Sequence, residues 1–372
     1  MRCWHDPTQR ADDDRGAGYH FDVRASAWIC VLAAVGTTLS GAPLPDTDAA
    51  MNGTLTDVEG LLVGHAVRQE RPTGCTVVLA RDGAVASVDV RGAAPGTRET
   101  DLLDPLNTVQ QVHAIGLAGG SAFGLDAATG VMGWLESQGI GFPVGPNRVP
   151  IVPAAILFDL GVGDARIRPD AACGREAAAA ASAAPVAQGN VGAGAGATVG
   201  KTYGMARAMK GGLGSASIRL PNGVVVAALV AVNARGDVID PATAKVVAGV
   251  RTADGRHLAD ARELMRQGLP APGNPGENTT LGVVATNATL SKTQAALVAR
   301  MAHDGFARAI SPVHTPSDGD VIFALATARR TGPVDVGLIG ALAADVTAMA
   351  IVNAVRHAES LPALPSARSL MP

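Results

Sequence analysis

The chain is poor in aromatic and charged residues. Of its 372 residues, 3% are aromatic and 17% are charged, and the formal net charge is −3. A protein without excess positive charge has no electrostatic attraction for nucleic acid, and so few aromatic rings provide no platform on which bases could stack. We therefore expect no nucleic-acid partner.

Cysteine is scarce as well. The four cysteines, Cys3, Cys30, Cys75 and Cys173, are widely separated, and no two of them form a CxxC pair. The eight histidines are equally dispersed and include no HExxH motif. The sequence therefore indicates neither a zinc ribbon nor a disulfide framework, and we expect no metal and no cofactor.

The sequence is rich in apolar and small residues instead. Hydrophobic residues make up 47% of the chain, and there are 45 glycines. This length and composition allow a sizeable, closely packed core in one large or two modest domains. Regular apolar patterns begin only near Met51. We therefore expect a single catalytic domain over residues 51–372, preceded by a poorly structured extension or a wrongly assigned start over residues 1–50.

A short apolar run interrupts this N-terminal extension. It covers residues 27–35 and is followed by Ser40-Gly41-Ala42, small residues of the kind found at signal-peptide cleavage sites. Against a signal peptide, the preceding region is long and acidic, and the run is too short to cross a bilayer. We predict a cytoplasmic protein without a membrane partner, with secretion as the alternative if residues 24–42 act as a signal peptide.

The spacing of apolar residues predicts a layered α+β fold with largely antiparallel sheets. A spacing of two predicts strands, and a spacing of three to four predicts helices. Hairpin turns are expected at Arg81-Asp82-Gly83 and at Pro221-Asn222-Gly223. The expected strands cover residues 61–65, 76–80, 85–90, 112–118, 156–158, 216–220, 224–232, 281–288 and 321–326, and the expected helices cover 125–138, 175–184, 291–310 and 336–360.

The pair Asn278-Thr279 stands where a loop meets a strand. Three prolines within residues 270–275 predict an irregular connector before it, and the apolar run 281–288 predicts a buried strand after it. In this setting the Thr279 hydroxyl can attack the Asn278 carbonyl, shift the chain to an ester and let water complete the cut. The new α-amine, with a reference pKa of about 7.7–8.0, can then serve as general base for its own hydroxyl.

Five further polar residues are candidates for the same site. An ammonium group from Lys201 or Lys210, each beside glycine, would lower the pKa of a nearby α-amine by like-charge repulsion. Asn233, at the end of a predicted strand, can offer its amide to an oxyanion. Asp318 and Asp320 can orient the α-ammonium and the hydroxyl. The residues alone leave the ordinary alternatives open: a solvated lysine, a surface amide and a turn.

Two other motifs carry weaker signals. Gly200-Lys201-Thr202 is typical of a phosphate-binding loop, but no preceding glycine stands at the required spacing of four residues. The segment Gly119 to Phe123 is similar to a nucleophile elbow, but the final glycine is displaced by one position. We interpret it as a tight turn whose residues Gly120 and Ser121 line a substrate cleft.

Together these residues resemble the L-aminopeptidase D-amidase/D-esterase family, which includes β-aminopeptidases and the nylon-oligomer hydrolase. The resemblance extends from Thr56 to Ala358 and rests on several separated motifs in the same order. These motifs are Thr56-Asp57-Val58, Val63-Gly64-His65, residues 98–103, residues 119–125, residues 210–214, Asn278-Thr279-Thr280 and residues 314–320.

The resemblance implies an N-terminal-nucleophile hydrolase with a four-layer α-β-β-α sandwich. It implies a precursor that cuts itself between Asn278 and Thr279 into an α chain, up to residue 278, and a β chain, 279–372, and that works as a homotetramer of processed protomers. Carried over by position, the site consists of Thr279 as nucleophile, Asn233 as oxyanion donor, Lys201 as active-site lysine, and Asp318 and Asp320 as supporting acids.

One departure from the family concerns the substrate cleft. Some members have a tyrosine where this chain has Phe158, and phenylalanine has no hydroxyl to donate. The sequence predicts an aminopeptidase or amidase that hydrolyses small peptides or amino-acid amides through an acyl-enzyme. The alternatives are an acyltransferase of the ornithine acetyltransferase type and a non-catalytic protein that retains the fold.

Overall fold

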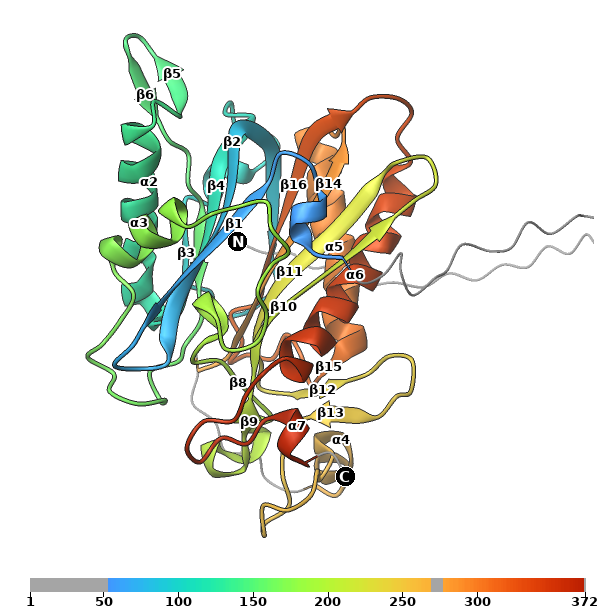
Figure 1. Ribbon diagram of the computed structural model, residues 1–372. Helices are drawn as coiled ribbons and strands as arrows, with labels where there is room; N and C mark the ends of the chain where they lie inside the picture. The colour runs from blue at the N-terminus through green and yellow to red at the C-terminus, as the bar shows by residue number, and fades with distance from the viewer. Residues whose placement is uncertain (1–52, 269–276, 371–372) are drawn as a thin grey trace, which may run out of the picture. The chain divides into compact units, whose positions relative to one another are not determined.

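The computed structural model describes residues 53–268 and 277–370, and these form strands covered by helices (Figure 1). The N-terminal extension with its signal-like run and the proline-rich connector at 270–275 lie outside the described residues. The helices are α2 (Ala127–Ser137), α3 (Ala171–Ala179), α4 (Ala261–Arg266), α5 (Lys292–Ala309), α6 (Val336–Arg356) and α7 (Ala367–Leu370).

Most strands belong to one nine-stranded sheet. Its order is β10-β11-β14-β16-β2-β4-β7-β3, and β1 pairs with β2 beside this path. The members are β1 (Leu62–Arg68), β2 (Thr73–Val90), β3 (Thr97–Arg98), β4 (Gln111–Ala118), β7 (Ala154–Ile156), β10 (Gly212–Arg219), β11 (Val225–Asn233), β14 (Thr279–Ala288) and β16 (Val321–Arg330). The remaining strands are β5 (Phe142–Val144), β6 (Asn147–Val149), β8 (Thr198–Val199), β9 (Met209–Lys210), β12 (Asp237–Ile239), β13 (Val246–Ala248) and β15 (Ile310–Ser311).

Pairing in the large sheet is mostly antiparallel, as the sequence predicts. The exceptions are two parallel pairs, β14 with β16 and β4 with β7. Each parallel pair is joined through a helix, α5 in the first case and α2 in the second, because parallel neighbours need a long crossover. The fold is therefore a mixed α/β fold in which hairpins and two crossover units are combined.

Most buried apolar side chains belong to three large clusters separated by strands. In β11 the alternate residues Val226 and Val230 face one cluster, shared with α5 and α6, whereas Val225 and Leu229 face a second. The third cluster lies between α2, α3 and the first half of β2. Since side chains alternate between the two faces of a strand, β11 is apolar on both faces and lies wholly inside the protein.

The predicted hairpin at Arg81-Asp82-Gly83 is wrong. Residues 73–90 form the single strand β2, whose first half pairs with β1 and whose second half pairs with β16. Gly83 has a φ of 83°, and the register with β4 shifts between Leu79 and Ala84. The Asp-Gly pair therefore makes an irregularity within a continuing strand, because pairing with β16 outweighs the local preference for a turn.

The other predicted elements differ from the structure mainly at their ends. Helix α5 starts after Ser291, whose hydroxyl accepts a hydrogen bond from the backbone N–H of Gln294, as expected for an N-cap. Helix α3 begins before residue 175, because the Asp170 side chain caps it by accepting from Cys173 N. Cys173 also forms a disulfide with Cys75 of β2, a pairing that the cysteine spacing did not indicate.

Helix α6 is apolar enough to be mistaken for a membrane span. Among the described residues it is the one helix whose length and composition would allow it to cross a bilayer. However, 67% of its apolar window is buried within the protein, and it packs against α5, β10 and β11 (Figure 1). Helix α6 is therefore apolar because it is a core helix that packs against these elements.

We expect Gly214→Ala to destabilise the contact between β10 and α6. A Cβ at Gly214 would lie 2.0 Å from Ala350 O and 2.4 Å from Ala354 N, which are backbone atoms of α6 that cannot rotate away. Overpacking of this kind costs about 1–3 kcal/mol in the free energy of unfolding, measured by urea denaturation. Gly161→Ala is the control, because a Cβ there meets nothing within 4 Å. Equal stability of the two variants would contradict the close packing described.

Candidate active site

Thr279 lies where the ends of three segments meet. It is the first residue of β14 and is buried, and it pairs directly with Asn233, the last residue of β11. On its other side runs the segment that leads into β16, where Asn278 bridges to Asp318. The strand register therefore brings together Asn233, Thr279 and Asp318, which are far apart in the sequence.

The peptide bond before Thr279 is held by two hydrogen bonds to its carbonyl oxygen. The Asn278 oxygen accepts from Gly319 N at 2.9 Å and from Thr279 Oγ1 at 2.5 Å. A Cβ at Gly319 would lie 2.8 Å from that same Oγ1 and 2.5 Å from Ala94 O, so this approach requires glycine. The hydroxyl thus lies beside the carbonyl that it is predicted to attack, and a backbone N–H polarises that carbonyl.

The two acids behind this bond are held in different ways. Asp320 Oδ1 accepts from Thr280 N at 2.7 Å, and its Oδ2 accepts from His314. Asp318 Oδ2 accepts from Thr315 N at 2.7 Å, whereas its Oδ1 is buried without a hydrogen-bond partner among the described residues. Burial, and then the negative charge of Asp320, raise the pKa of Asp318 above its usual range.

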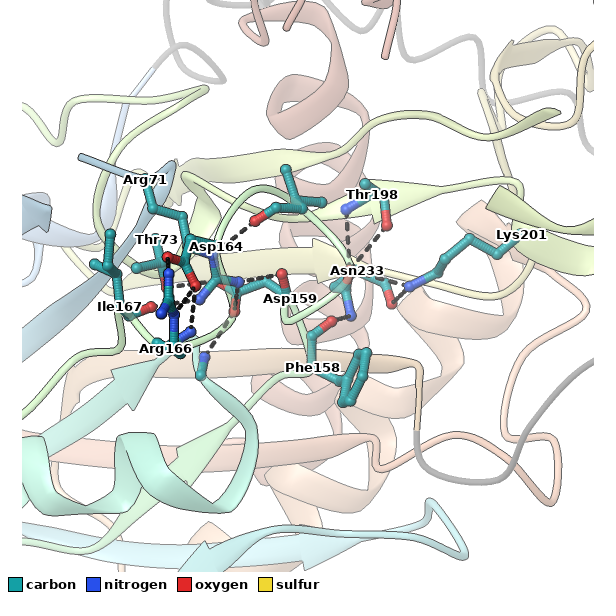
Figure 2. Close-up of polar contacts among 12 residues, drawn as sticks. Arg71, Thr73, Phe158, Asp159, Asp164, Arg166, Ile167, Thr198, Lys201 and Asn233 are labelled. Carbon is teal, nitrogen blue, oxygen red and sulfur yellow. Dashed lines mark hydrogen bonds and ion pairs between the residues drawn. The ribbon is translucent and has the colours of Figure 1, made fainter. Parts of the chain in front are cut away.

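Lys201 reaches the same site from the 3-10 turn after β8. Its Nζ donates to Asn233 O at 3.0 Å, to Asn233 Oδ1 at 3.0 Å and to Glu277 O at 3.1 Å (Figure 2). Burial lowers the pKa of Lys201 to about 7, against the opposing attraction of Asp318 and other acids. Its ammonium and neutral forms are therefore close in free energy near neutral pH.

The Asn233 side chain joins three elements. Its Oδ1 accepts from Thr198 N at 3.0 Å as well as from Lys201, and its Nδ2 donates to Phe158 O at 2.9 Å. In Figure 2 it lies between Phe158 and Lys201. An amide nitrogen carries two donors, so one N–H of Asn233 remains beyond the bond to Phe158.

Lys210, the other candidate lysine, lies elsewhere. It is fully buried, and its Nζ donates to Gly194 O at 2.8 Å, Ala197 O at 3.0 Å and Gly211 O at 3.2 Å. Burial lowers its pKa to about 7. These contacts tie the glycine-rich loop to β9, whereas Lys201 is the lysine that contacts Asn233 and the chain before Asn278.

A cavity of about 200 Å³ adjoins Lys201. Phe158 lines it and is half-buried, and most of the lining is apolar. Gly120 and Ser121 are not among its lining residues: Gly120 N donates to Asp159 Oδ1, and Ser121 N donates to Leu157 O. The full lining consists of Phe158, Asp159, Leu160, Gly161, Val162, Thr198, Lys201, Met205 and Glu277.

A buried ion pair supports one wall of this cavity and was not foreseen from the sequence. Arg71 Nη2 lies 2.7 Å from Asp159 Oδ1, and Thr73 Oγ1 donates to Asp159 Oδ2 at 2.6 Å (Figure 2). Arg71 also donates to Val162 O at 2.6 Å and to Ile167 O at 2.7 Å. The pair joins residues 88 positions apart, so no short motif marks it. In the sequence, the only local indication of this pair is that an acidic residue, Asp159, directly follows the predicted strand 156–158.

The comparison with protein families identifies the class to which this arrangement belongs. Residues 53–367 match the model described as peptidase family S58. The chain belongs to peptidase family S58. It is therefore an enzyme of the hydrolase class, and the resemblance drawn from the separated motifs is confirmed.

Relatives in this family include proteins named as aminopeptidases. An uncharacterized aminopeptidase of Mycobacterium bovis is 44% identical over 347 residues, which cover 86% of this chain and 98% of the relative. A 6-aminohexanoate-oligomer endohydrolase of a Kocuria species is 32% identical over 315 residues, covering 81% of this chain and 85% of that protein.

Solved structures show the same fold for this S58 peptidase. The L-aminopeptidase D-Ala-esterase/amidase of Ochrobactrum anthropi, described as a variant of the Ntn hydrolase fold, has a TM-score of 0.60 at 20% identity. The match covers 85% of this chain and 90% of that one. A β-aminopeptidase of a Burkholderia species has a TM-score of 0.58 at 24% identity, covering 82% and 87%.

We expect Lys210 to make the stability of the S58 fold depend on pH. Its pKa is about 7 in the folded protein and about 10.4 in the unfolded chain, so between these values the unfolded chain holds more protons. The free energy of unfolding should therefore rise with pH in this window, by at most about 1.4 kcal/mol per pH unit for this one group.

Lys210→Met should remove this contribution. Urea unfolding at pH 7 and pH 9.5, with Thr279→Ala as background to keep one chain, compares the slopes. Lys245→Met, at an exposed position, is the control and should keep the slope of its parent. A slope in Lys210→Met that matches the parent would show that Lys210 does not titrate in this range.

Proposed function

We propose that the chain is a self-processing N-terminal-threonine hydrolase that cleaves small peptides or amino-acid amides. The observation that carries this proposal is the contact between Thr279 Oγ1 and the Asn278 carbonyl oxygen, with Gly319 N on that same oxygen. A hydroxyl next to its own preceding carbonyl has a short path to the carbonyl carbon. The Gly319 N–H can stabilise the negative charge that develops on the oxygen.

Self-cleavage on this geometry needs no other reactant than water. Thr279 Oγ1 forms a bond to the Asn278 carbonyl carbon, and the bond from that carbon to Thr279 N breaks. The hydroxyl proton passes to the departing nitrogen, which leaves an ester between the two residues and a free α-amine. Water then hydrolyses the ester, giving an α chain that ends at Asn278 and a β chain that begins at Thr279.

The unpartnered carboxylate oxygen of Asp318 supports this outcome. A buried acceptor without a hydrogen bond is costly, and it is expected to find a partner in the functional state. The α-ammonium of a cut Thr279 would be a donor of the right charge beside Asp318 Oδ1. The uncut chain would then hold the acceptor ready for the group that cleavage releases.

In the processed enzyme the same groups would act on a substrate amide. The α-amine of Thr279 takes the proton of its own hydroxyl, and Oγ1 attacks the substrate carbonyl to form an acyl-enzyme. The remaining N–H of Asn233 would donate to the oxyanion. When Lys201, beside Asn233, is protonated, its positive charge would favour the neutral form of the α-amine.

The cavity next to Lys201 favours small substrates with an uncharged side chain. Two carboxylates line it, Asp159 and Glu277, and that of Asp159 is occupied by Arg71, Thr73 and Gly120. Phe158 adds an apolar surface and no hydroxyl. Names such as aminopeptidase and 6-aminohexanoate-oligomer endohydrolase among the relatives agree with amide substrates.

We extend the proposal to the architecture and assembly. The three apolar clusters, with strands between them and helices on the two outer clusters, support the arrangement as a four-layer α-β-β-α sandwich. One catalytic domain over residues 51–372, a homotetramer of processed protomers and a cytoplasmic location remain predictions that rest on the sequence and the family resemblance.

We expect the variants at Thr279 and Thr280 to separate the nucleophile from its neighbour. Thr279→Ala removes the attacking oxygen, so the chain should stay uncut and hydrolyse no amide. Thr279→Ser keeps the oxygen and should still be cut, at a different rate because serine lacks the β-branch that restricts χ1. Thr280→Ala, the matched control, should cut normally because successive side chains of a strand face opposite sides.

The measurements are denaturing electrophoresis and release of amine from a panel of amino-acid amides, with and without ornithine as acceptor. Amine release by Thr279→Ala at the rate of the parent would rule out Thr279 as nucleophile. Acyl transfer to ornithine in place of hydrolysis would identify the enzyme as an acyltransferase of the ornithine acetyltransferase type. A cut protein that accepts no substrate would favour a non-catalytic role.

A further inference from the structure

We infer that His314 is a positioning residue. It holds the Asp320 carboxylate, and the carboxylate in turn holds the first residues of β14 in the geometry that the chemistry of Thr279 needs. This inference rests on the proposed function for its catalytic meaning. The contacts that support it form a short path from the His314 ring to the backbone of Thr280.

Asp320 joins His314 to the strand that carries Thr279. Its Oδ2 accepts from His314 Nδ1 at 2.8 Å and from His314 N at 3.2 Å, while its Oδ1 accepts from Thr280 N at 2.7 Å. Asp320 is buried, and hydrogen bonds to a buried carboxylate are short and directional. One carboxylate therefore fixes the residue after Thr279 against the backbone and the ring of His314.

The hydrogen bonds between His314 and Asp320 join the two ends of the segment 314–320. That segment contains Asp318, whose Oδ2 accepts from Thr315 N, and Gly319, whose N–H donates to the Asn278 carbonyl. His314 itself has a φ of 53°, a left-handed conformation that directs its backbone N–H to Asp320. The positions of the free Asp318 oxygen and of the Gly319 donor thus depend on how this segment is closed.

The His314 ring is held by Asp320 and by two aromatic neighbours. Nδ1 donates to Asp320, so it carries a proton, and Nε2 is buried without a partner among the described residues. The ring packs against His303 at 4.9 Å and Phe306 at 6.0 Å between centroids.

Asp320 is the charged group in contact with the ring, because its Oδ2 lies 2.8 Å from His314 Nδ1. Burial lowers the pKa of His303 to about 4, so this neighbour on α5 is neutral at pH 7. His303 Nε2 in turn lies 3.0 Å from Asp89 O on β2, and the Asp89 carboxylate is paired with Arg91. The Asp320 carboxylate is therefore the acceptor toward which His314 Nδ1 donates.

Two substitutions separate the ring donor from the backbone conformation. Glycine and asparagine both tolerate positive φ, but only asparagine offers an N–H donor near the position of Nδ1. His314→Gly should slow both self-cleavage and amide turnover by about 10- to 100-fold, the loss expected for one hydrogen bond to a charged group. The change should fall on kcat, with KM nearly constant, and His314→Asn should recover most of the rate.

The matched control is His257→Gly, at an exposed histidine away from the site, which should behave as wild type. Wild-type rates in a folded His314→Gly protein would overturn the inference. Rates in His314→Asn as low as those in His314→Gly would overturn it too, because the ring donor would then not be what matters.

A second readout does not depend on activity. In uncut Thr279→Ala protein, the ¹⁵N shifts of the His314 ring should show the proton on Nδ1, and the Thr280 amide proton should resonate far downfield. Adding His314→Gly should move the Thr280 signal upfield, and adding His314→Asn should largely restore it. A proton on Nε2 alone, or a Thr280 signal that does not respond, would overturn the inference. If these signals behave as expected while the wild type neither cuts itself nor hydrolyses amides, the proposed function fails and the positioning contact stands.

Discussion

The site depends on the register of β14 between its two neighbours. Antiparallel pairing with β11 places Thr279 opposite Asn233, and parallel pairing with β16 places Leu281 opposite Val321, so that Thr280 lies beside Asp320. A shift by one residue would turn the Thr279 side chain to the other face of the strand. Because β14 is buried on both faces, that shift would also misplace its apolar side chains, and the register is strongly specified.

Several charged side chains around this register are buried and paired. Lys201 and Lys210 each donate to three oxygens, and the Arg71–Asp159 pair is enclosed by further hydrogen bonds. A buried charge is tolerated only when its donors and acceptors are satisfied. Among the described residues near Thr279, four atoms are buried without a hydrogen-bond partner: Asn278 Oδ1, Thr280 Oγ1, His314 Nε2 and Asp318 Oδ1. Under the proposed function, Asp318 Oδ1 is the one that the α-ammonium released by cleavage would contact.

Local sequence patterns predicted the long strands and helices, and several candidate residues named from the sequence lie together around Thr279 in the fold. The β10–β11 hairpin, α5 and α6 follow from apolar spacing and from turn or cap residues that act over a few positions. The hairpin expected at residues 81–83 failed because pairing of β2 with distant β16 decided the local conformation. The residues within a few positions of a turn do not show with which distant strand the segment will pair.

Other parts of the site depend on contacts that only the folded chain makes. Lys201 and Lys210 have similar glycine-containing surroundings in the sequence, and they differ because the turn after β8 brings Lys201 alone to Asn233. Arg71 meets Asp159 across 88 positions, and His314 was part of a motif without an assigned role until its contact with Asp320 was seen. Residues that position a site, unlike those that react, carry little chemical signature in the sequence.

Intact-mass measurement of the purified wild-type protein tests self-processing most directly, because it requires no choice of substrate. We predict two chains in equal amounts, one ending at Asn278 and one beginning at Thr279. These chains should stay associated under native conditions, since β14 lies in the core. A single uncut chain that nevertheless hydrolyses amides, or a cut at any other bond, would contradict it.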